Sequence, residues 1–253
     1  MGKASRSKQD KLAKINYGQK SSNFPWFPVI ISGIAVVVVA AVVFVTMFAN
    51  QAAKEPAVAP SSSVSIPTDI KTTVDTDTGV ISLGEGKTVL SEFFDFGCPY
   101  CGQYFEQNGE LVRGYVASGD ITLEVQPLGM LDAQFQGTKF STRSASALYC
   151  VAEKSPNSVL DFIGNMYENQ PEEGTSGLDT ETIVKIAKNV GADDAVSCIE
   201  DRTYEDFVKE KSAPVLSADW FTGTPAIKLN GEVVDANSSP GILEKAIAEA
   251  KGE

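Results

Sequence analysis

Apolar and polar positions divide this chain into three parts. Residues 21–53 contain no charged side chain, and the run from Val29 to Phe48 is mostly apolar. Residues 50–70 then show no apolar period and are rich in Ala, Pro and Ser. Beyond them, strand-like runs and helix-like stripes follow one another, which predicts a folded α/β domain over residues 71–253.

The first part of this domain is predicted to be strand, helix and strand. The apolar run Val89–Phe96 ends at Gly97, and Pro99 suits the first turn of a helix. Alternate residues from Ile121 to Val125 are apolar, which is typical of a strand. Elements in this order predict a βαβ unit with parallel strands. The predicted elements are strands over 79–83, 87–94 and 121–126 and a helix over about 99–117, with a break at Asn108-Gly109 left open.

A helical period replaces the strand pattern over about residues 132–218. Pro214 is expected to kink or end the last helix of this block. Apolar runs on either side of Asn230-Gly231 then predict a hairpin over residues 226–235, because Asn-Gly suits a type I′ turn. A final helix is expected to open at Ser239-Pro240.

The motif Cys98-Pro99-Tyr100-Cys101 places two thiols where the predicted helix begins. Free backbone N–H groups and the positive end of the helix dipole favour a thiolate on Cys98, and the thiolate is the reactive form. Cys101 lies one helical turn away, so the pair can exist as a disulfide or a dithiol. Half of a zinc site is the alternative interpretation. The chain has no histidine and no second Cys-x-x-Cys, so we favour a redox pair that needs no metal or other cofactor.

Charge is distributed unevenly along the chain. Residues 1–50 carry six basic side chains and one acidic side chain, a net charge of +5. The whole chain has a net charge of −12, so the remaining residues carry −17. So acidic a domain is a poor candidate for binding nucleic acid or anionic lipid headgroups.

The apolar run near the N-terminus predicts a membrane anchor. Its residues, at about 1.5 Å each, span roughly 30 Å, the thickness of a bilayer core. The basic cluster precedes the run, so we expect a cytoplasmic tail over 1–25, a transmembrane signal anchor over 26–49 and a flexible linker over 50–70. The domain then lies outside the cytoplasmic membrane. A cleaved signal peptide is the alternative, but the run exceeds the ~7–15 residues of a signal core.

Four short motifs follow one another along the domain: Glu92-Phe93-Phe94, Cys98-Pro99-Tyr100-Cys101, Gly223-Thr224-Pro225 and Asn230-Gly231. With them, and with its predicted order of elements, the chain resembles the DsbA-like thiol–disulfide oxidoreductases in the membrane-anchored form typical of bacteria. The resemblance covers about residues 75–250. It implies an α/β thioredoxin fold with a helical insertion over about 132–218, preceded here by one transmembrane helix.

The resemblance implies a role for each cysteine of the motif. Cys98 is the attacking thiolate, and Cys101 resolves the mixed disulfide that forms. Many strong oxidases of the family carry His where this chain has Tyr100. Tyrosine cannot be a cation, so we expect an oxidising but less extreme redox couple.

The resemblance also implies a binding site for substrate proteins. Pro225 is expected to be cis and to face the cysteines, and X-Pro bonds tolerate the cis form. Thr224 then offers its backbone to an extended substrate segment, beside Pro99 and Tyr100. The alternative for Thr224-Pro225 is an ordinary turn, which we would prefer if the chain lacked the Cys-x-x-Cys motif.

Glu92 stands six residues before Cys98, where the family and its thioredoxin relatives place a buried acid. Burial in an apolar strand disfavours the carboxylate and raises its pKa. Such an acid can exchange a proton with Cys101, directly or through water. The alternative is that Glu92 points to solvent. Asp95 has a weaker claim, because an odd step along the strand places it on the opposite face.

The two remaining cysteines, Cys150 and Cys198, fall in predicted helices of the insertion. Thiols outside the membrane usually end as disulfides. We expect a structural disulfide, which closes a loop of about fifty residues and contributes about 4 kcal/mol in the chain-entropy model. Two buried free cysteines are the alternative.

Two classes of function remain open at this point. The first is an enzyme that donates its Cys98–Cys101 disulfide to reduced or unfolded exported proteins, with a disulfide reductase or isomerase as the nearest enzymatic rival. The resemblance implies a quinone-linked membrane partner that re-oxidises the pair. The second class is a non-catalytic, anchored module that binds substrate proteins or a metal. No dimerisation segment is recognised, so a monomer is expected.

Overall fold

The computed structural model describes residues 67, 70–235 and 241–252. The predicted tail, the anchor, most of the linker and the predicted helix start at Ser239-Pro240 lie outside the described residues. Among the described helices, none is both long enough and apolar enough to cross a membrane.

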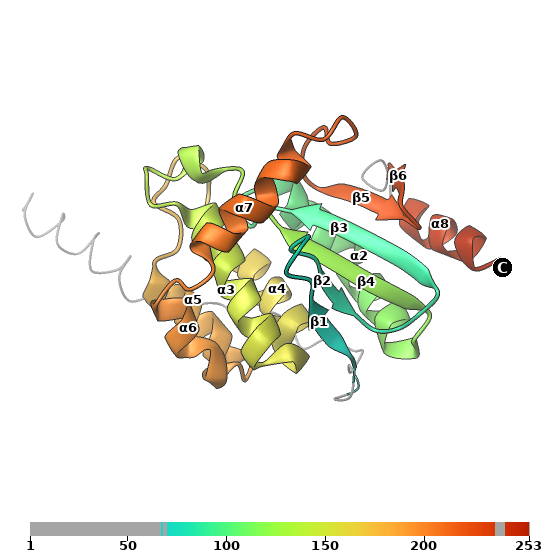
Figure 1. Ribbon diagram of the computed structural model, residues 1–253, viewed down its shortest axis with the longest axis horizontal. Helices are drawn as coiled ribbons and strands as arrows, with labels where there is room; N and C mark the ends of the chain where they lie inside the picture. Colours follow the sequence, from blue (N-terminus) through green and yellow to red (C-terminus); the bar gives the residue numbers. More distant parts are fainter. Residues whose placement is uncertain (1–66, 68–69, 236–240, 253) are drawn as a thin grey trace, which may run out of the picture. The chain divides into compact units, whose positions relative to one another are not determined.

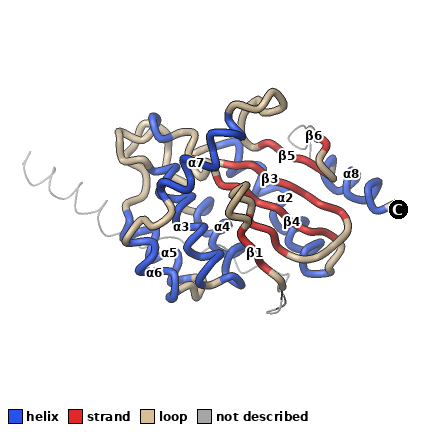
Figure 2. Tube along the Cα trace, in the orientation of Figure 1, coloured by secondary structure: helices blue, strands red, loops and turns tan. Residues whose placement is uncertain are grey.

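A six-stranded mixed sheet forms the centre of the domain, in the order β1-β2-β4-β3-β5-β6 (Figures 1 and 2). Helices α2 and α8 pack against its strands. The strands are β1 (Thr72–Val74), β2 (Ile81–Leu83), β3 (Thr88–Phe94), β4 (Ile121–Pro127), β5 (Ala226–Leu229) and β6 (Glu232–Val234), and the two helices are α2 (Pro99–Ser118) and α8 (Ile242–Lys251).

The predicted βαβ unit is confirmed, and it occupies the middle of the sheet. Strands β3 and β4 pair in parallel from Thr88↔Ile121 to Phe94↔Pro127. Helix α2 runs unbroken to Ser118 and ends at Gly119, whose φ of 75° is easily adopted by glycine. The Asn108-Gly109 pair does not break it: Asn108 is buried, and its side-chain amide donates to the Tyr104 carbonyl one turn earlier.

One strand was missed by the sequence analysis. Strand β1 has only three residues, and it pairs antiparallel with β2 at the edge of the sheet. Its half-exposed residues carry no apolar alternation long enough to recognise. The strand predicted from Gly79 begins instead at Ile81, because Gly79, with a φ of 83°, lies in the preceding turn.

The helical insertion lies between β4 and β5, and its helices gather beside one side of the sheet (Figure 1). Pro214 lies in the last turn of its final helix, which continues only two residues further. The helices are α3 (Phe140–Lys154), α4 (Val159–Glu168), α5 (Thr180–Asn189), α6 (Val196–Glu200) and α7 (Glu205–Leu216), with short 3-10 turns over Asp132–Gln134, Pro156–Ser158 and Asp193–Ala195.

One continuous apolar core joins the sheet to the insertion. Leu90 and Leu123 from the sheet, with Leu148 of α3 and Phe162 of α4, belong to the same cluster and are almost completely buried. Each such side chain contributes about 1.5–3 kcal/mol by leaving water. The insertion is therefore packed as part of the domain.

The predicted hairpin of β5 and β6 is confirmed. Asn230 and Gly231 have φ values of 50° and 88°, as a type I′ turn requires. Asn230 also holds the hairpin to β3. Its side-chain oxygen accepts a hydrogen bond from the Val89 backbone amide at 2.9 Å, and its backbone amide donates to the Val89 carbonyl at 2.8 Å.

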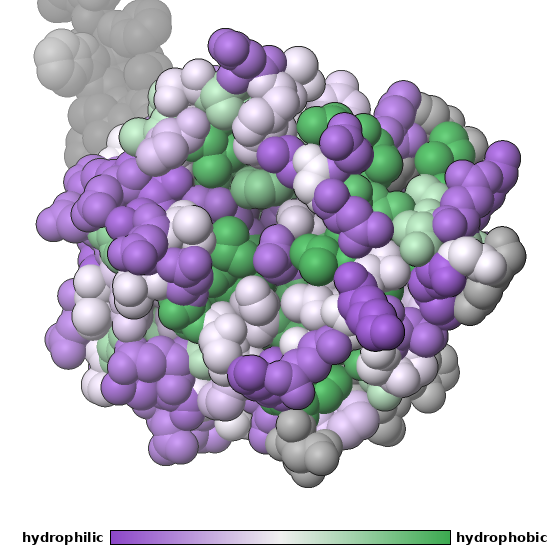
Figure 3. Space-filling model, turned by 45° about the vertical axis from the view of Figure 1, so that its right-hand side comes forward, coloured by the Kyte–Doolittle hydropathy of each residue, from purple (hydrophilic) through white to green (hydrophobic). Residues whose placement is uncertain are grey.

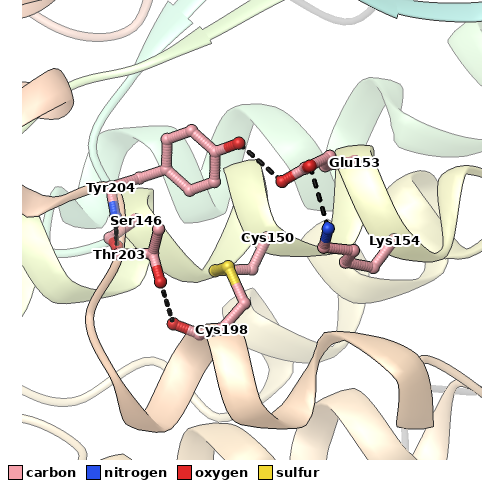
Figure 4. Close-up of a disulfide and its surroundings, with 7 residues drawn as sticks. All are labelled: Ser146, Cys150, Glu153, Lys154, Cys198, Thr203 and Tyr204. Carbon is pink, nitrogen blue, oxygen red and sulfur yellow. Dashed lines mark hydrogen bonds and ion pairs between the residues drawn. A yellow bond between two sulfur atoms is a disulfide. The ribbon is translucent and has the colours of Figure 1, made fainter.

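A disulfide joins Cys150 of α3 to Cys198 of α6, the pair expected from the sequence (Figure 4). Both cysteines are buried. Beside the bond, Thr203 donates to the Cys198 carbonyl at 3.2 Å, and the Tyr204 hydroxyl donates to Glu153 of α3 at 2.6 Å. The disulfide and these hydrogen bonds hold α6 and the start of α7 to α3.

Replacing both Cys150 and Cys198 by alanine should lower the free energy of unfolding by up to about 4 kcal/mol, because the unfolded chain is no longer cross-linked across this loop. Denaturant unfolding of the variant and the unmodified protein, each with the Cys98–Cys101 pair reduced, measures the difference. A change of less than about 1 kcal/mol would contradict a stabilising role.

Candidate active site

The end of β3 and the start of α2 place the two cysteines of the motif. After β3 the chain turns, and the Cys98 amide donates to the Asp95 carbonyl at 3.0 Å. Cys98 is then the N-cap of α2 and Pro99 its first residue, as the sequence predicted. The side chains of Cys98 and Cys101 are free thiols, 4% and 1% exposed.

The two thiols have opposite acidities. The pKa of Cys98 is lowered to about 6, first because the Cys101 thiol donates a hydrogen bond to its sulfur, and further by Thr224 and the backbone N–H groups of Cys101 and Tyr100, against the effect of burial. The pKa of Cys101 is raised well above its ordinary value by burial and by the neighbouring Cys98. The sequence predicted the Cys98 thiolate from the helix terminus alone. The structure shows that Cys101 is its main support.

The loop before β5 faces the same sulfur. The Thr224-Pro225 peptide bond is cis, and Pro225 is buried. When protonated, Cys98 donates a hydrogen bond to the Thr224 carbonyl, with sulfur and oxygen 3.3 Å apart. The Thr224 hydroxyl is buried and makes no well-formed hydrogen bond to a described residue, yet it lies close enough to lower the pKa of both thiols.

Glu92 lies behind the cysteines on β3 and is 6% exposed, so the solvent-facing alternative is wrong. Burial raises its pKa to about 7, and a hydrogen bond of 2.7 Å from the Tyr104 hydroxyl partly opposes this rise. Glu92, Cys101, Tyr104 and Pro225 line one small cavity of about 10 Å³. That volume is close to the smallest that admits a water molecule.

Asp95 is also fully buried, which the sequence analysis did not foresee. Burial raises its pKa to about 6, although backbone amides of Gly97, Leu131 and Met130 donate to it and lower the pKa. The distances of these hydrogen bonds are 2.8–2.9 Å. Asp95 therefore ties the turn that carries Cys98 to the loop after β4.

Three further residues around the cysteines were missed. Tyr104 lies one turn after Cys101 on α2, a spacing that could have identified it. Tyr167 of α4 packs its ring on Phe94 and Phe96, and its hydroxyl is buried without a hydrogen-bond partner among the described residues. Gln170, just after α4, contacts the turn directly. Tyr167 and Gln170 come from the insertion, and no local pattern marks them.

Comparison with known proteins places this site in a family. Residues 77–249 match the family model described as thioredoxin, so the chain belongs to the thioredoxin family. The fold is similar to reduced DsbA from Mycobacterium tuberculosis, with 26% identity, 78% of this chain and 91% of that chain covered, and a TM-score of 0.60. It is also similar to the reduced disulfide bond oxidoreductase DsbG of that organism, with 25% identity, 75% and 90% coverage, and a TM-score of 0.60.

Within the thioredoxin superfamily, the chain is a DsbA-like disulfide oxidoreductase with the helical insertion of that group. A curated relative is the serine/threonine-protein kinase PknE of Mycobacterium tuberculosis, 29% identical over 118 residues. That match covers 45% of this chain and only 21% of the kinase. The chain thus spans about a fifth of the length of this relative.

Replacing Glu92 by glutamine should stabilise the protein at alkaline pH. The pKa of Glu92 in the folded protein, about 7, lies above the ordinary value of 4.5, so the folded state binds the extra proton and loses stability as pH rises from about 4.5 to 7. Glu92→Gln removes this loss. We expect a gain on the order of 2–3 kcal/mol at pH 8 and little change near pH 4.

Denaturant unfolding at several pH values tests this expectation, with Glu106→Gln on the exposed side of α2 as the matched control. A stability difference between Glu92→Gln and the unmodified protein that is constant with pH would contradict it.

Thr224→Val should raise the pKa of Cys98, because it removes a hydroxyl beside the sulfur and keeps a β-branched side chain of similar size. The ultraviolet absorbance of the thiolate, followed through a pH titration, measures the effect. Thr122→Val is the control, since the Thr122 hydroxyl donates to the Gly86 carbonyl away from the two sulfurs. An unchanged titration of Cys98 in Thr224→Val would show that the hydroxyl has no influence.

Proposed function

We propose that this protein is a thiol–disulfide oxidoreductase that donates its Cys98–Cys101 disulfide to reduced exported proteins. The observation that carries the proposal is the placement of the two thiols: Cys98 is the N-cap of α2 with its sulfur 3.3 Å from the Thr224 carbonyl, and Cys101 lies one turn further on. In this setting the pKa of Cys98 is lowered and that of Cys101 is raised. A thiol of low pKa is a good leaving group in disulfide exchange, and a stabilised thiolate makes the reduced form of the pair favourable. Such a pair favours transfer of its disulfide to a substrate.

The reaction proceeds in two exchange steps. A substrate thiolate attacks the Cys98 sulfur of the enzyme disulfide, the Cys98–Cys101 bond breaks, and Cys101 leaves as a thiolate. Its high pKa makes it take a proton, which Glu92 supplies directly or through water, since the pKa of Glu92 is about 7. A second substrate thiolate then attacks the substrate sulfur of the mixed disulfide, and Cys98 leaves as a thiolate. The substrate loses two electrons and the enzyme gains them.

The surface around Cys98 supports substrate binding. Figure 3 shows one face of the molecule, where hydrophobic residues surface in small patches among hydrophilic ones. Tyr100, at 69%, is the most exposed large hydrophobic side chain in the described part of the chain, and Pro99 beside it is exposed. An extended substrate segment can hydrogen-bond with the backbone of Thr224 and pack on these two side chains. Pro225, the next residue, is buried and lines the same small cavity as Glu92 and Cys101.

The proposal includes a location and partners. Residues 26–49 anchor the chain in the cytoplasmic membrane, residues 50–70 act as a linker, and residues 71–253 work outside the membrane as a monomer. The substrates are reduced or unfolded exported proteins, and a quinone-linked membrane protein re-oxidises the pair. The apolar run and the basic cluster before it support the anchor. The acidic composition argues against nucleic acid as a partner.

The test uses the purified full-length protein in detergent, with the Cys98–Cys101 pair oxidised. Mixed with a reduced, unfolded protein that carries two cysteines, it should form the substrate disulfide and become reduced. Cys98→Ser should abolish the reaction. Reduced Cys101→Ser is tested in the reverse direction, mixed with the disulfide form of the same substrate: the Cys98 thiolate attacks one substrate sulfur, the other leaves as a thiolate, and the mixed disulfide should accumulate because the resolving thiol is missing. Cys150→Ala with Cys198→Ala should keep the activity under conditions in which that variant is folded. An oxidised protein that leaves the substrate reduced would falsify the proposal.

A further inference from the structure

The end of α4 reaches the turn that carries the reactive sulfur through one side chain. Gln170 lies two residues after α4, where its own amide donates to the Tyr167 carbonyl at 3.0 Å. Its side-chain nitrogen donates to the carbonyls of Phe96 and Cys98, both at 2.9 Å. One amide group from the insertion thus uses both of its N–H bonds on this turn, one on the Phe96–Gly97 peptide unit and one on the Cys98–Pro99 peptide unit.

Gly102, in the first turn of α2, leaves room for the Gln170 side-chain amide because it has no Cβ atom. A Cβ atom at Gly102 would come within 2.6 Å of the Gln170 side-chain oxygen. That distance is shorter than any ordinary contact, so any larger residue at 102 would push the amide away from the turn. The amide of Gln170 therefore lies against α2 on one side and against the turn on the other.

The two carbonyls that Gln170 holds have special positions. The Cys98 carbonyl belongs to the peptide unit that joins Cys98 to Pro99, which has no N–H of its own. This carbonyl also accepts the first helical hydrogen bonds, from Cys101 at 3.0 Å and Gly102 at 3.3 Å. Fixing its plane fixes the direction in which the first turn of α2 presents its N–H groups.

Two N–H groups of this first turn, those of Tyr100 and Cys101, also face the Cys98 sulfur. The backbone amides of Tyr100 and Cys101 each lower the pKa of Cys98, and the Cys101 thiol on the same turn lowers it most. A small rotation of the turn would misalign all three at once, because hydrogen bonds weaken steeply with angle. A group that fixes the turn therefore influences the pKa of Cys98 without contacting its sulfur.

We propose that Gln170 is a positioning residue of the redox centre, through which the helical insertion orients the first turn of α2 and keeps Cys98 in its thiolate form. The proposal rests on the proposed function only in taking Cys98 as the reactive sulfur. An amide suits the task because it offers two donors on a neutral group. A carboxylate at this position has no donor and would repel the thiolate.

Replacing Gln170 by leucine removes both donors and keeps a side chain of similar size. We expect the pKa of Cys98 to rise by about half a unit to one unit, so the rate of its alkylation at pH 6 should fall about two- to fivefold. The equilibrium with glutathione should shift severalfold toward the protein disulfide, because the reduced form loses its stabilised thiolate.

Gly102→Ala is the second variant, and it keeps Gln170 in the chain. Alanine is more favourable than glycine in a helix interior by about 1 kcal/mol, which offsets part of the cost of displacing the Gln170 amide. Its added methyl group should displace the amide, and we expect Cys98 to become less acidic as in Gln170→Leu. Denaturant unfolding of both variants is measured alongside, so that the titration of Cys98 is compared under conditions in which each variant is folded.

Gln136→Leu is the matched control. The side chain of Gln136 donates to the Gly174 carbonyl at 2.7 Å in an exposed loop, so its loss removes the same kind of bond away from the turn. Its Cys98 should titrate as in the unmodified protein.

If Gln170→Leu and Gly102→Ala also titrate like the unmodified protein, Gln170 is not a positioning residue, whatever happens to stability. Failure of the oxidised, unmodified protein to oxidise a substrate is a separate result that affects only the proposed function.

Discussion

The chemistry of this protein depends on how the Cys98 sulfur is held at the start of a helix. Cys98 lies at the junction of β3 and α2, and the groups that favour its thiolate come from the first turn of that helix, above all the thiol of Cys101. Burial opposes the thiolate, so the site works only while these donors stay aligned. The loop after β4, the cis-proline loop and Gln170 just after α4 each contribute a contact that fixes this junction.

Sheet topology brings together the parts of the site that are far apart in the chain. Strands β3 and β5 are antiparallel neighbours, with Glu92 opposite Ile227 and Phe93 opposite Ala226. The acid on β3 and the proline before β5 therefore meet behind and beside the same pair of thiols. The insertion separates these strands in sequence but leaves their pairing intact, and it returns to the site through the end of α4.

Sequence reasoning succeeded where the chemistry is local. The Cys-x-x-Cys motif, Pro99 at the first helical position and the Asn230-Gly231 turn each follow from the conformational preferences of two or three residues. It failed for Gln170, which contacts a carbonyl 72 positions away. Such contacts depend on how the insertion packs on the sheet, and the apolar stripes of its helices do not encode that arrangement.

The domain holds two cysteine pairs that must not exchange with each other. Thiol–disulfide exchange requires a thiolate to approach one sulfur of the bond in line, and access limits that approach. Cys150 is 0% exposed and Cys198 only 7% exposed, within the packed helices of the insertion. The exposed fraction alone does not distinguish the two pairs, because Cys98 is itself only 4% exposed. Their surroundings differ: Cys98 lies beside the exposed Pro99 and Tyr100, where a second protein can approach, whereas the Cys150–Cys198 bond joins two packed helices, α3 and α6.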